Sequence, residues 1–528
     1  MKKQLCKQLI TFAPLSLVAL LGLTSCNNAS SGNEKVVLRV LNAADYIYES
    51  GDISEEELEC NYSQYLSDDD MLDQFVSYME ETKGVSISVV YDTYDTNETM
   101  YNQMKTGKSS YDVIVASDYM VQKLISQDLI QPFPEGDAFD SIRDNISPYL
   151  WSFFDNIHPK DPNTDELLAD KVLSSYSAPY MWGTVGIMYN PEFYADLELD
   201  DCLELFSSWE ALYSEEAHNS FSIKDSVRDT YAVSIVHAFY ESEIAPLEEK
   251  LKNGEITEDQ FNDLLNSIFN RCDDATLEIV KEDMLKLKDN SFGFEVDSGK
   301  TDMIEGKIGA NVAWSGDATW AITEAEAEYE KELYFSIPKE GSNIWFDAFC
   351  IPKTSKHLEY ATDFIDFMSK PENAIQNMWY VGYTTATSSI EVLDYIYECY
   401  DVRGSVGAEL KEGTEYVEYD LSYFFDGVTS NPSDCVLYAY PETIGRTLTA
   451  QFPKQEDLSH LCVMDDFGLQ NKAVLDMWEK VRTNSLPVWA IIILFVELLT
   501  VGGFFIYLYV SKSYKRKMIK ARRLERNK

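Results

Sequence analysis

Short runs of apolar, often β-branched residues alternate along most of the chain with segments whose apolar residues recur every three or four positions. The first pattern is typical of buried strands, and the second is typical of amphipathic helices packed on a sheet. The strand-like runs are Val36–Leu41, Ser86–Tyr91, Val113–Ser117, Gly186–Tyr189, Phe221–Lys224, Ile308–Trp314, Leu333–Pro338 and Trp345–Pro352. The helix-like segments are Met71–Lys83, Glu98–Lys108, Leu358–Met368 and Glu372–Trp379. This alternation predicts an α/β fold with a parallel or mixed sheet.

Two longer apolar runs lie near the ends of the chain. The first follows Lys2 and Lys3 and is the short apolar core of a secretory signal, not of a permanent membrane span. The second, at 487–510, is long enough to cross a bilayer, which takes about 20 apolar residues. The segment 511–528 after it holds nine lysines and arginines against one acid. Positive segments stay in the cytoplasm, so this bias predicts a transmembrane helix with the main domain outside the cell.

The first apolar run closes on Leu23-Thr24-Ser25-Cys26. This tetrapeptide resembles the lipobox at which bacterial lipoproteins are cleaved and acylated on the cysteine. It implies a lipoprotein signal peptide at 1–26, a lipid on Cys26 and a flexible polar leash at 27–34. The alternative is an ordinary cleaved signal in which Cys26 has no role.

The chain is strongly acidic, with a net charge of −47 at pH 7. Nucleic-acid binding needs a basic surface, so the charge excludes that class of function. A negative surface concentrates cations near it, although solubility alone explains most of the charge. The cysteines and the five histidines show no paired or metal-ligating spacing, so we expect no metal site and no other cofactor.

The sequence contains no recognised catalytic motif. A phosphate-binding G-x-x-x-x-G-K-[ST], a G-x-S-x-G and an H-E-x-x-H are all missing from the chain, so we do not expect an enzyme. The neighbouring acids Asp225 and Asp229 leave a secreted hydrolase open as an alternative, but paired acids are common and carry little specificity.

Eight segments occur in an order that covers nearly the whole domain between the two apolar runs. They are Tyr91–Glu98, Tyr111–Val121, Ala178–Thr184, Asp225–Asp229, Trp314–Ala318, Pro338–Gly341, Trp345–Asp347 and Val381–Tyr383. In this order they resemble the spermidine/putrescine-binding proteins of bacterial ABC importers. The resemblance implies a two-lobed type II periplasmic-binding-protein fold with a cleft between the lobes, to which the apolar run adds a C-terminal transmembrane helix.

The resemblance also implies where the chain crosses between the lobes, near Gly183, Phe346 and Leu393. Lobe 1 is then formed by residues 35–183 and 346–393, and lobe 2 by residues 184–345 and 394–482. The transmembrane helix at 487–510 and the basic cytoplasmic tail at 511–528 follow.

A polyamine is a flexible apolar chain with spaced ammonium groups, so its site needs carboxylates at the ends and aromatic faces along the stem. Open α/β sheets bind ligands at the carboxyl ends of their strands, where several of the matching segments fall. Trp345 and Asp347 lie two residues apart in one strand and therefore point to the same face. The ligand-binding residues that the resemblance implies are Asp45, Tyr46, Ser117, Tyr119, Asp225, Ser226, Asp229, Trp314, Trp345, Asp347 and Tyr383.

Several of these residues have a structural alternative. Asp45 follows a strand and could be a turn acid, whereas Asp225 could cap the helix that follows it. An isolated tryptophan is usually a core residue, although a neighbouring acid argues against burial of Trp345 in the core. Ala43 and Ala44 replace an aromatic and a hydroxyl residue of the family, and Met464 stands where some members carry a glutamine, so the preferred polyamine stays open.

The expected function is therefore that of the extracellular substrate-binding component of a polyamine importer. Its partners would be putrescine or spermidine and the permease subunits in the membrane. We expect it on the extracytoplasmic face of the cell membrane, anchored by the C-terminal helix and by the lipid on Cys26. The alternatives are a solute-binding protein for ferric iron or another organic cation, and a membrane-tethered polyamine sensor.

Overall fold

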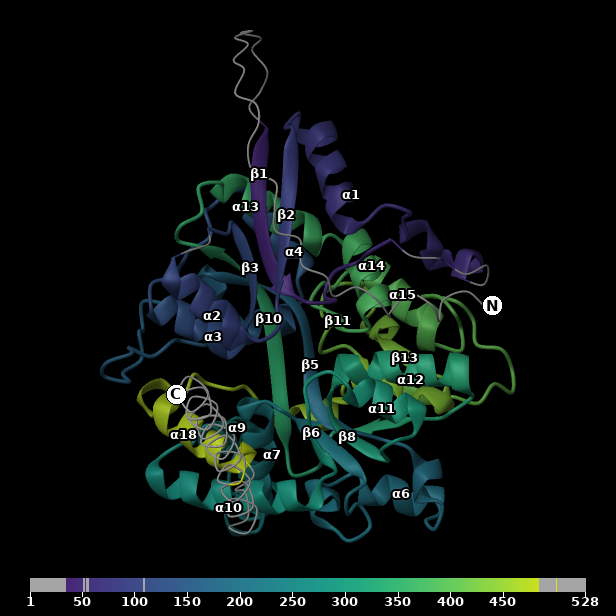
Figure 1. The fold of residues 1–528 in the computed structure, drawn as a ribbon. Helices are drawn as coiled ribbons and strands as arrows, with labels where there is room; N and C mark the ends of the chain where they lie inside the picture. Colours follow the sequence, from purple (N-terminus) through teal and green to yellow (C-terminus); the bar gives the residue numbers. More distant parts are fainter. Residues whose placement is uncertain (1–34, 51–52, 54–56, 108–109, 484–499, 501–528) are drawn as a thin grey trace, which may run out of the picture.

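One mixed β-sheet organises the protein, with helices packed around it (Figure 1). The computed structural model describes residues 35–50, 53, 57–107, 110–483 and 500. The main path of the sheet has the order β2-β1-β3-β10-β5-β8-β6-β7. The strands are β1 (Val36–Ala43), β2 (Ile87–Tyr94), β3 (Val113–Ser117), β4 (Ile130–Gln131), β5 (Ser177–Tyr189), β6 (Phe221–Lys224), β7 (Gly293–Glu295), β8 (Ala310–Trp314), β9 (Tyr334–Ser336), β10 (Ser342–Pro352), β11 (Thr384–Thr385), β12 (Val417–Asp420), β13 (Val436–Ala439) and β14 (Leu461–Cys462).

The α-helices follow most of the strands in the chain, as expected for an α/β fold. They are α1 (Met71–Tyr78), α2 (Asn97–Thr106), α3 (Asp118–Ser126), α4 (Asp137–Asn145), α5 (Pro148–Phe154), α6 (Leu199–Leu205), α7 (Val227–Phe239), α8 (Ala245–Lys252), α9 (Glu258–Phe269), α10 (Asp274–Asn290), α11 (Gly299–Glu305), α12 (Ser315–Tyr329), α13 (Leu358–Ser369), α14 (Pro371–Val381), α15 (Ile390–Tyr400), α16 (Thr447–Gln451), α17 (Gln455–Leu458) and α18 (Asn471–Arg482). The predicted α/β class is confirmed.

Two long strands, β5 and β10, join the two halves of the sheet. Residues 177–184 of β5 pair with β10 in the first sheet half, which also contains β1, β2 and β3. Residues 185–189 of β5 pair with β8 and β9 in the second sheet half, which also contains β6 and β7. Figure 1 shows both strands running from one half to the other. The exact lobe boundaries near Gly183, Phe346 and Leu393 remain a prediction.

Most predicted strands occur at the expected places, but β5 starts at Ser177, well before the predicted Gly186. Every residue of β5 is buried, so the alternation of apolar and polar residues that marks a one-sided strand does not appear. The predicted helix Met71–Lys83 is α1 followed by one π-helical turn that ends at Gly84, whose φ is +64°.

The prediction of a C-terminal transmembrane helix at 487–510 is corrected here. In the part of the chain that the structure describes, no helix is both long and apolar enough to cross a membrane. A span takes about 20 apolar residues, whereas the longest described helix, α10, has 17 residues and many charges. Apart from Thr500, positions 487–510 lie outside the described residues. The α/β architecture is supported, and the predicted transmembrane helix is not.

The signal peptide at 1–26, the leash at 27–34 and the tail at 511–528 also lie outside the described residues. The lipid on Cys26 therefore stays a prediction from the sequence.

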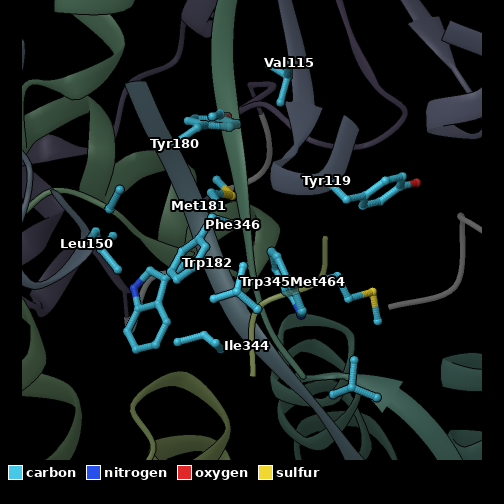
Figure 2. Packing of buried hydrophobic residues seen from close by; sticks show 14 of the residues in the cluster. Val115, Tyr119, Leu150, Tyr180, Met181, Trp182, Ile344, Trp345, Phe346 and Met464 are labelled. Atoms are coloured by element: carbon cyan, nitrogen blue, oxygen red, sulfur yellow. The ribbon is translucent and has the colours of Figure 1, made fainter. Parts of the chain in front are cut away.

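The core runs along β5 and β10 into both halves of the sheet. Side chains alternate along a strand, and Figure 2 shows this at the centre of β10. Phe346 lies on the same side as Trp182 and Leu150, while Trp345 lies on the other side, toward Tyr119 and Met464 (Figure 2). One face of β10 is therefore filled by core aromatics, and the other face is left for the candidate site.

Candidate functional site

Asp347 in β10 lies directly opposite Ser117, the last residue of β3, in an antiparallel pairing. Side chains of paired residues in neighbouring strands lie on one face of the sheet, about 5 Å apart. This register lets the Ser117 hydroxyl donate a hydrogen bond of 2.6 Å to Asp347 Oδ1. Asn97 Nδ2 donates to Ser117 Oγ at 2.9 Å, so the hydroxyl is oriented toward the carboxylate.

The other oxygen of Asp347 accepts a hydrogen bond of 2.8 Å from the Tyr46 hydroxyl. Tyr46 is buried in the turn after β1. Its backbone carbonyl accepts hydrogen bonds from Asn42 Nδ2 at 3.2 Å and from the Tyr180 hydroxyl at 2.8 Å. The pairing of β5 with β10 shifts register next to Asp347, leaving Tyr180 without a partner in β10. Such irregularities redirect side chains, and here Tyr180 holds the turn that carries Tyr46.

Tyr383 lies between two aromatic side chains of the site. Its ring centroid is 5.3 Å from that of Tyr46 and 5.5 Å from that of Trp345. Gly382 ends α14 in the left-handed conformation, with φ +82°, and so turns the chain toward the site. Gly316 faces Tyr383, and a Cβ at this glycine would collide with the ring. The position of Tyr383 therefore depends on both glycines.

A second group of side chains continues from Tyr383 into the second sheet half. The Tyr383 hydroxyl donates a hydrogen bond of 3.0 Å to Asp317 Oδ1. Lys224 Nζ, at the end of β6, lies 3.1 Å from Asp317 Oδ2 and 4.3 Å from the centroid of the Trp314 ring. Trp314 Nε1 donates to Asp229 Oδ1 at 3.0 Å. These contacts connect the two sheet halves.

We refer to this connected set as the acidic-aromatic cluster. It brings together seven of the eleven predicted site residues and adds two residues that were not predicted, Lys224 and Asp317. Its members are Tyr46, Ser117, Lys224, Asp229, Trp314, Asp317, Trp345, Asp347 and Tyr383.

The acids of the cluster differ in their electrostatic surroundings. Burial raises the pKa of Asp347, and the hydrogen bonds from Ser117 and Tyr46 only partly oppose it. Burial likewise raises the pKa of Asp229 against the hydrogen bonds that it accepts. Burial also acts on Asp317, but Lys224 and Lys300 outweigh it and lower the pKa of that carboxyl. Asp317 is therefore paired with lysines. Lys224 also acts to lower the pKa of Asp229 but does not outweigh its burial, and no cation acts on Asp347.

Three predicted site residues near the turns have other environments. Asp45 is exposed in a left-handed turn with φ +52°, which agrees with the turn alternative. Asp225 Oδ2 lies 2.5 Å from Arg482 Nη2 at the end of α18. Ser226 is the N-cap of α7, and its hydroxyl accepts a hydrogen bond of 3.4 Å from the Asp229 amide. In this structure these three residues have turn, ion-pair and capping contacts.

Tyr119 lies beside the cluster and contacts different partners. Its hydroxyl donates to Glu98 Oε1 at 3.3 Å, and the Arg228 guanidinium lies 4.1 Å from the centroid of its ring. Arg228 also pairs with Asp466 at 3.4 Å. Tyr119 therefore takes part in a contact between α3 and α7, one from each sheet half.

The two additional cluster residues had weak signals in the sequence. Lys224 ends a buried strand, where a lysine is unusual because charged side chains are rarely buried without a partner. Asp317 lies in the segment Trp314–Ala318 that contributed to the family resemblance. Neither residue could be paired with the other from the sequence, since 93 positions separate them.

A separate cavity of about 600 Å³ lies on the second sheet half, against α7 and α10. Two of its acids contact a histidine: His237 lies 2.8 Å from Asp283 Oδ2 and 3.0 Å from Glu210 Oε2. Its lining shares no residue with the acidic-aromatic cluster. Chemically, the cluster is the better candidate, because Asp347 and Asp229 lie there beside aromatic faces without an ion-pair partner, an arrangement suited to an organic cation.

Comparison with known proteins adds an independent result. Residues 73–394 match the family described as bacterial extracellular solute-binding protein. The spermidine/putrescine-binding periplasmic protein of Salmonella typhimurium is 27% identical over 62% of this chain and 76% of its own length. The putrescine-binding periplasmic protein SpuD of Pseudomonas aeruginosa is 26% identical over 59% of this chain and 73% of its own length. The resemblance predicted from the sequence segments is confirmed.

A solved structure supports the architecture. The spermidine/putrescine ABC transporter substrate-binding protein PotD from Streptococcus pneumoniae aligns with a TM-score of 0.50 and 25% identity, covering 85% of this chain and 100% of that protein. The predicted two-lobed periplasmic-binding-protein fold is thereby supported for the region that contains the acidic-aromatic cluster.

Proposed function

The chain belongs to the family of bacterial extracellular solute-binding proteins, and from this premise we propose that it captures polyamines outside the cytoplasm for an ABC importer. The family is one of binding proteins and not of enzymes. Relatives that carry the names spermidine/putrescine-binding and putrescine-binding protein support the ligand class. Delivery to permease subunits is part of the same proposal.

The observation that carries the proposal is the environment of Asp347. Its carboxylate is partly buried beside aromatic rings and accepts hydrogen bonds from two uncharged hydroxyls, those of Tyr46 and Ser117. A buried carboxylate without a cation is unfavourable, and a nearby positive charge stabilises it. A ligand ammonium group would supply that charge. The adjacent face of Trp345 would contact the methylene stem and add a cation–π interaction.

Ligand entry requires the aromatic side chains to move apart. Tyr383 is in contact with both Tyr46 and Trp345, so the structure has the rings of the site packed on one another. Two-lobed binders open and close by rotation about a few connecting segments. In this protein β5 and β10 connect the two sheet halves, so we propose that bending of these two strands opens the site.

Isothermal titration calorimetry tests the proposal directly. We expect the protein to bind at least one of putrescine, cadaverine, spermidine and spermine with a defined stoichiometry. A ferric citrate titration separates the iron alternative, since the proposed site offers ammonium-binding carboxylates. Absence of heat with all four polyamines, for a protein that unfolds cooperatively on heating, would contradict the proposed function.

The expected location is outside the cytoplasm, as the family description indicates. A lipid on Cys26 is the proposed attachment to the membrane, and it rests on the sequence alone. Intact-mass measurement of the protein purified from a membrane fraction tests it, because Cys26→Ser should abolish the lipid mass.

A further inference from the structure

Lys224 is an unusual residue to find in a site for cations. It is 2% exposed at the end of β6, and its ammonium group lies 4.3 Å from the centroid of the Trp314 ring. Carboxylate oxygens of Glu295 and Asp317 lie 3.0 and 3.1 Å from it. An ammonium group of a ligand binds favourably over an indole face and between two carboxylates. In this protein the ammonium group of Lys224 already occupies such a position.

The charge of Lys224 is held by its surroundings. Burial lowers the pKa of Lys224, but the carboxylates of Asp317 and Glu295 outweigh burial and raise it overall. Lys300 adds a second positive charge 3.7 Å from Asp317. Lys300 itself lies closer to Asp297, at 3.1 Å. Asp317 and Glu295 both pair with Lys224, so neither is left to pair with a ligand.

Two carboxylates of the cluster remain for a ligand, those of Asp229 and Asp347. In the described part of the chain, neither forms an ion pair with a lysine or arginine; Asp229 is buried and Asp347 is partly buried within the cluster. A third buried acid nearby, Asp118, accepts backbone amide hydrogen bonds at both oxygens, from Tyr119 at 2.6 Å and from Phe346 at 3.3 Å. The cluster thus offers two unpaired carboxylates.

We propose that Lys224 is a built-in cation that sets the specificity of the site, so that the protein prefers diamines to triamines and tetramines. This inference rests on the proposed function. A diamine places one ammonium group at each of the two unpaired carboxylates. Asp229 lies at the nitrogen edge of the Trp314 ring, whereas Lys224 lies over the ring. A third ammonium group over that ring would meet the charge of Lys224 without a free carboxylate to offset it, and like charges repel.

Wild-type calorimetry tests the inference without any substitution. We expect putrescine or cadaverine to bind about tenfold or more tightly than spermidine, since specificity is the difference between two binding free energies. If spermidine binds as tightly as the best diamine, the inference is overturned while the proposed function stands. If no polyamine binds, both fail, so the two failures are distinguishable.

Two matched variants then assign the preference to Lys224. Lys224→Met removes the ammonium group from Trp314, so the ratio of spermidine to putrescine affinity should rise by about tenfold or more. Lys300→Met is the control, because Lys300 also pairs with Asp317 but lies over Trp320, at 5.5 Å, instead of Trp314. Its ratio should stay within about threefold of wild type.

Folding of each variant is checked by its thermal midpoint before titration, because Lys224→Met leaves two buried acids with one fewer cation. The ratio of spermidine to putrescine affinity in the wild type tests the diamine preference even if this variant does not fold. An unchanged ratio in a folded Lys224→Met, or an equal change in Lys300→Met, would overturn the assignment of specificity to Lys224.

Discussion

The sharpest test of the proposed site is Asp347→Asn. Asparagine keeps the shape of the side chain but removes the charge that a ligand ammonium would pair with. The carboxylate lies between the Ser117 hydroxyl at 2.6 Å and the Tyr46 hydroxyl at 2.8 Å. The amide oxygen of asparagine can accept from one of these hydroxyls, and its NH2 group can donate to the oxygen of the other. The substitution therefore changes the charge of the site more than its packing.

The expected effect follows from the burial of the pair. Removing one partner from a buried, hydrogen-bonded charge pair costs about 2–5 kcal/mol. Since each 1.4 kcal/mol is a factor of ten, the Kd for putrescine should rise about 30-fold to several thousand-fold. The same substitution should not destabilise the ligand-free protein. Because the pKa of Asp347 is raised, its contribution to stability is present at low pH and is lost as the pH rises through that pKa. At neutral pH the substitution should therefore leave the thermal midpoint unchanged or raise it.

Titration calorimetry at neutral pH measures the loss, and differential scanning calorimetry checks the fold. Asp225→Asn is the matched control, because this predicted site residue pairs with Arg482 outside the acidic-aromatic cluster. Its Kd for putrescine should lie within about threefold of wild type, as for a partly exposed ion pair. An unchanged Kd in Asp347→Asn, or an equal loss in both variants, would refute the reasoning.

Three further predictions follow from the cluster. Trp345→Ala should weaken putrescine binding by about 1–2 kcal/mol, measured by calorimetry, through lost cation–π and stem contact; wild-type affinity would contradict this. Gly316→Ala should lower both affinity and the thermal midpoint, because the new methyl group collides with Tyr383; a variant equal to wild type in both would place Tyr383 elsewhere. Affinity should fall as the pH is lowered through the raised pKa of Asp347, since only its ionised form pairs with a cation, and Asp347→Asn should lose this part of the pH dependence.

The local pattern of the chain predicted much of the fold. Runs such as Val113–Ser117 carry the strand signal in their own composition, and β3 has those bounds. The pattern failed for β5, because a strand buried on both faces shows no alternation of apolar and polar residues. The apolar run at 487–510 predicted a transmembrane helix, which is not supported: no helix among the described residues is long and apolar enough to cross a membrane.

The candidate site was predicted in part. Trp345 and Asp347 share a face because they are two residues apart in a strand, and this follows from the sequence alone. Asp45, Asp225 and Ser226 carry suitable chemistry at suitable segments, yet the structure gives them turn, ion-pair and capping contacts. A residue type at a strand end specifies what a side chain could bind, but not which way the loop turns it.

The sequence by itself determined the order of strands and helices, the acidic charge of the domain and the family to which it belongs, because these properties are set within short segments or by composition. Only the tertiary structure decided which charges are already paired. Lys224 meets Asp317 and Asp347 meets Ser117 across separations of 93 and 230 positions. Coulombic and hydrogen-bond energies depend on distances in space, and the folding of the two sheet halves around β5 and β10 sets those distances.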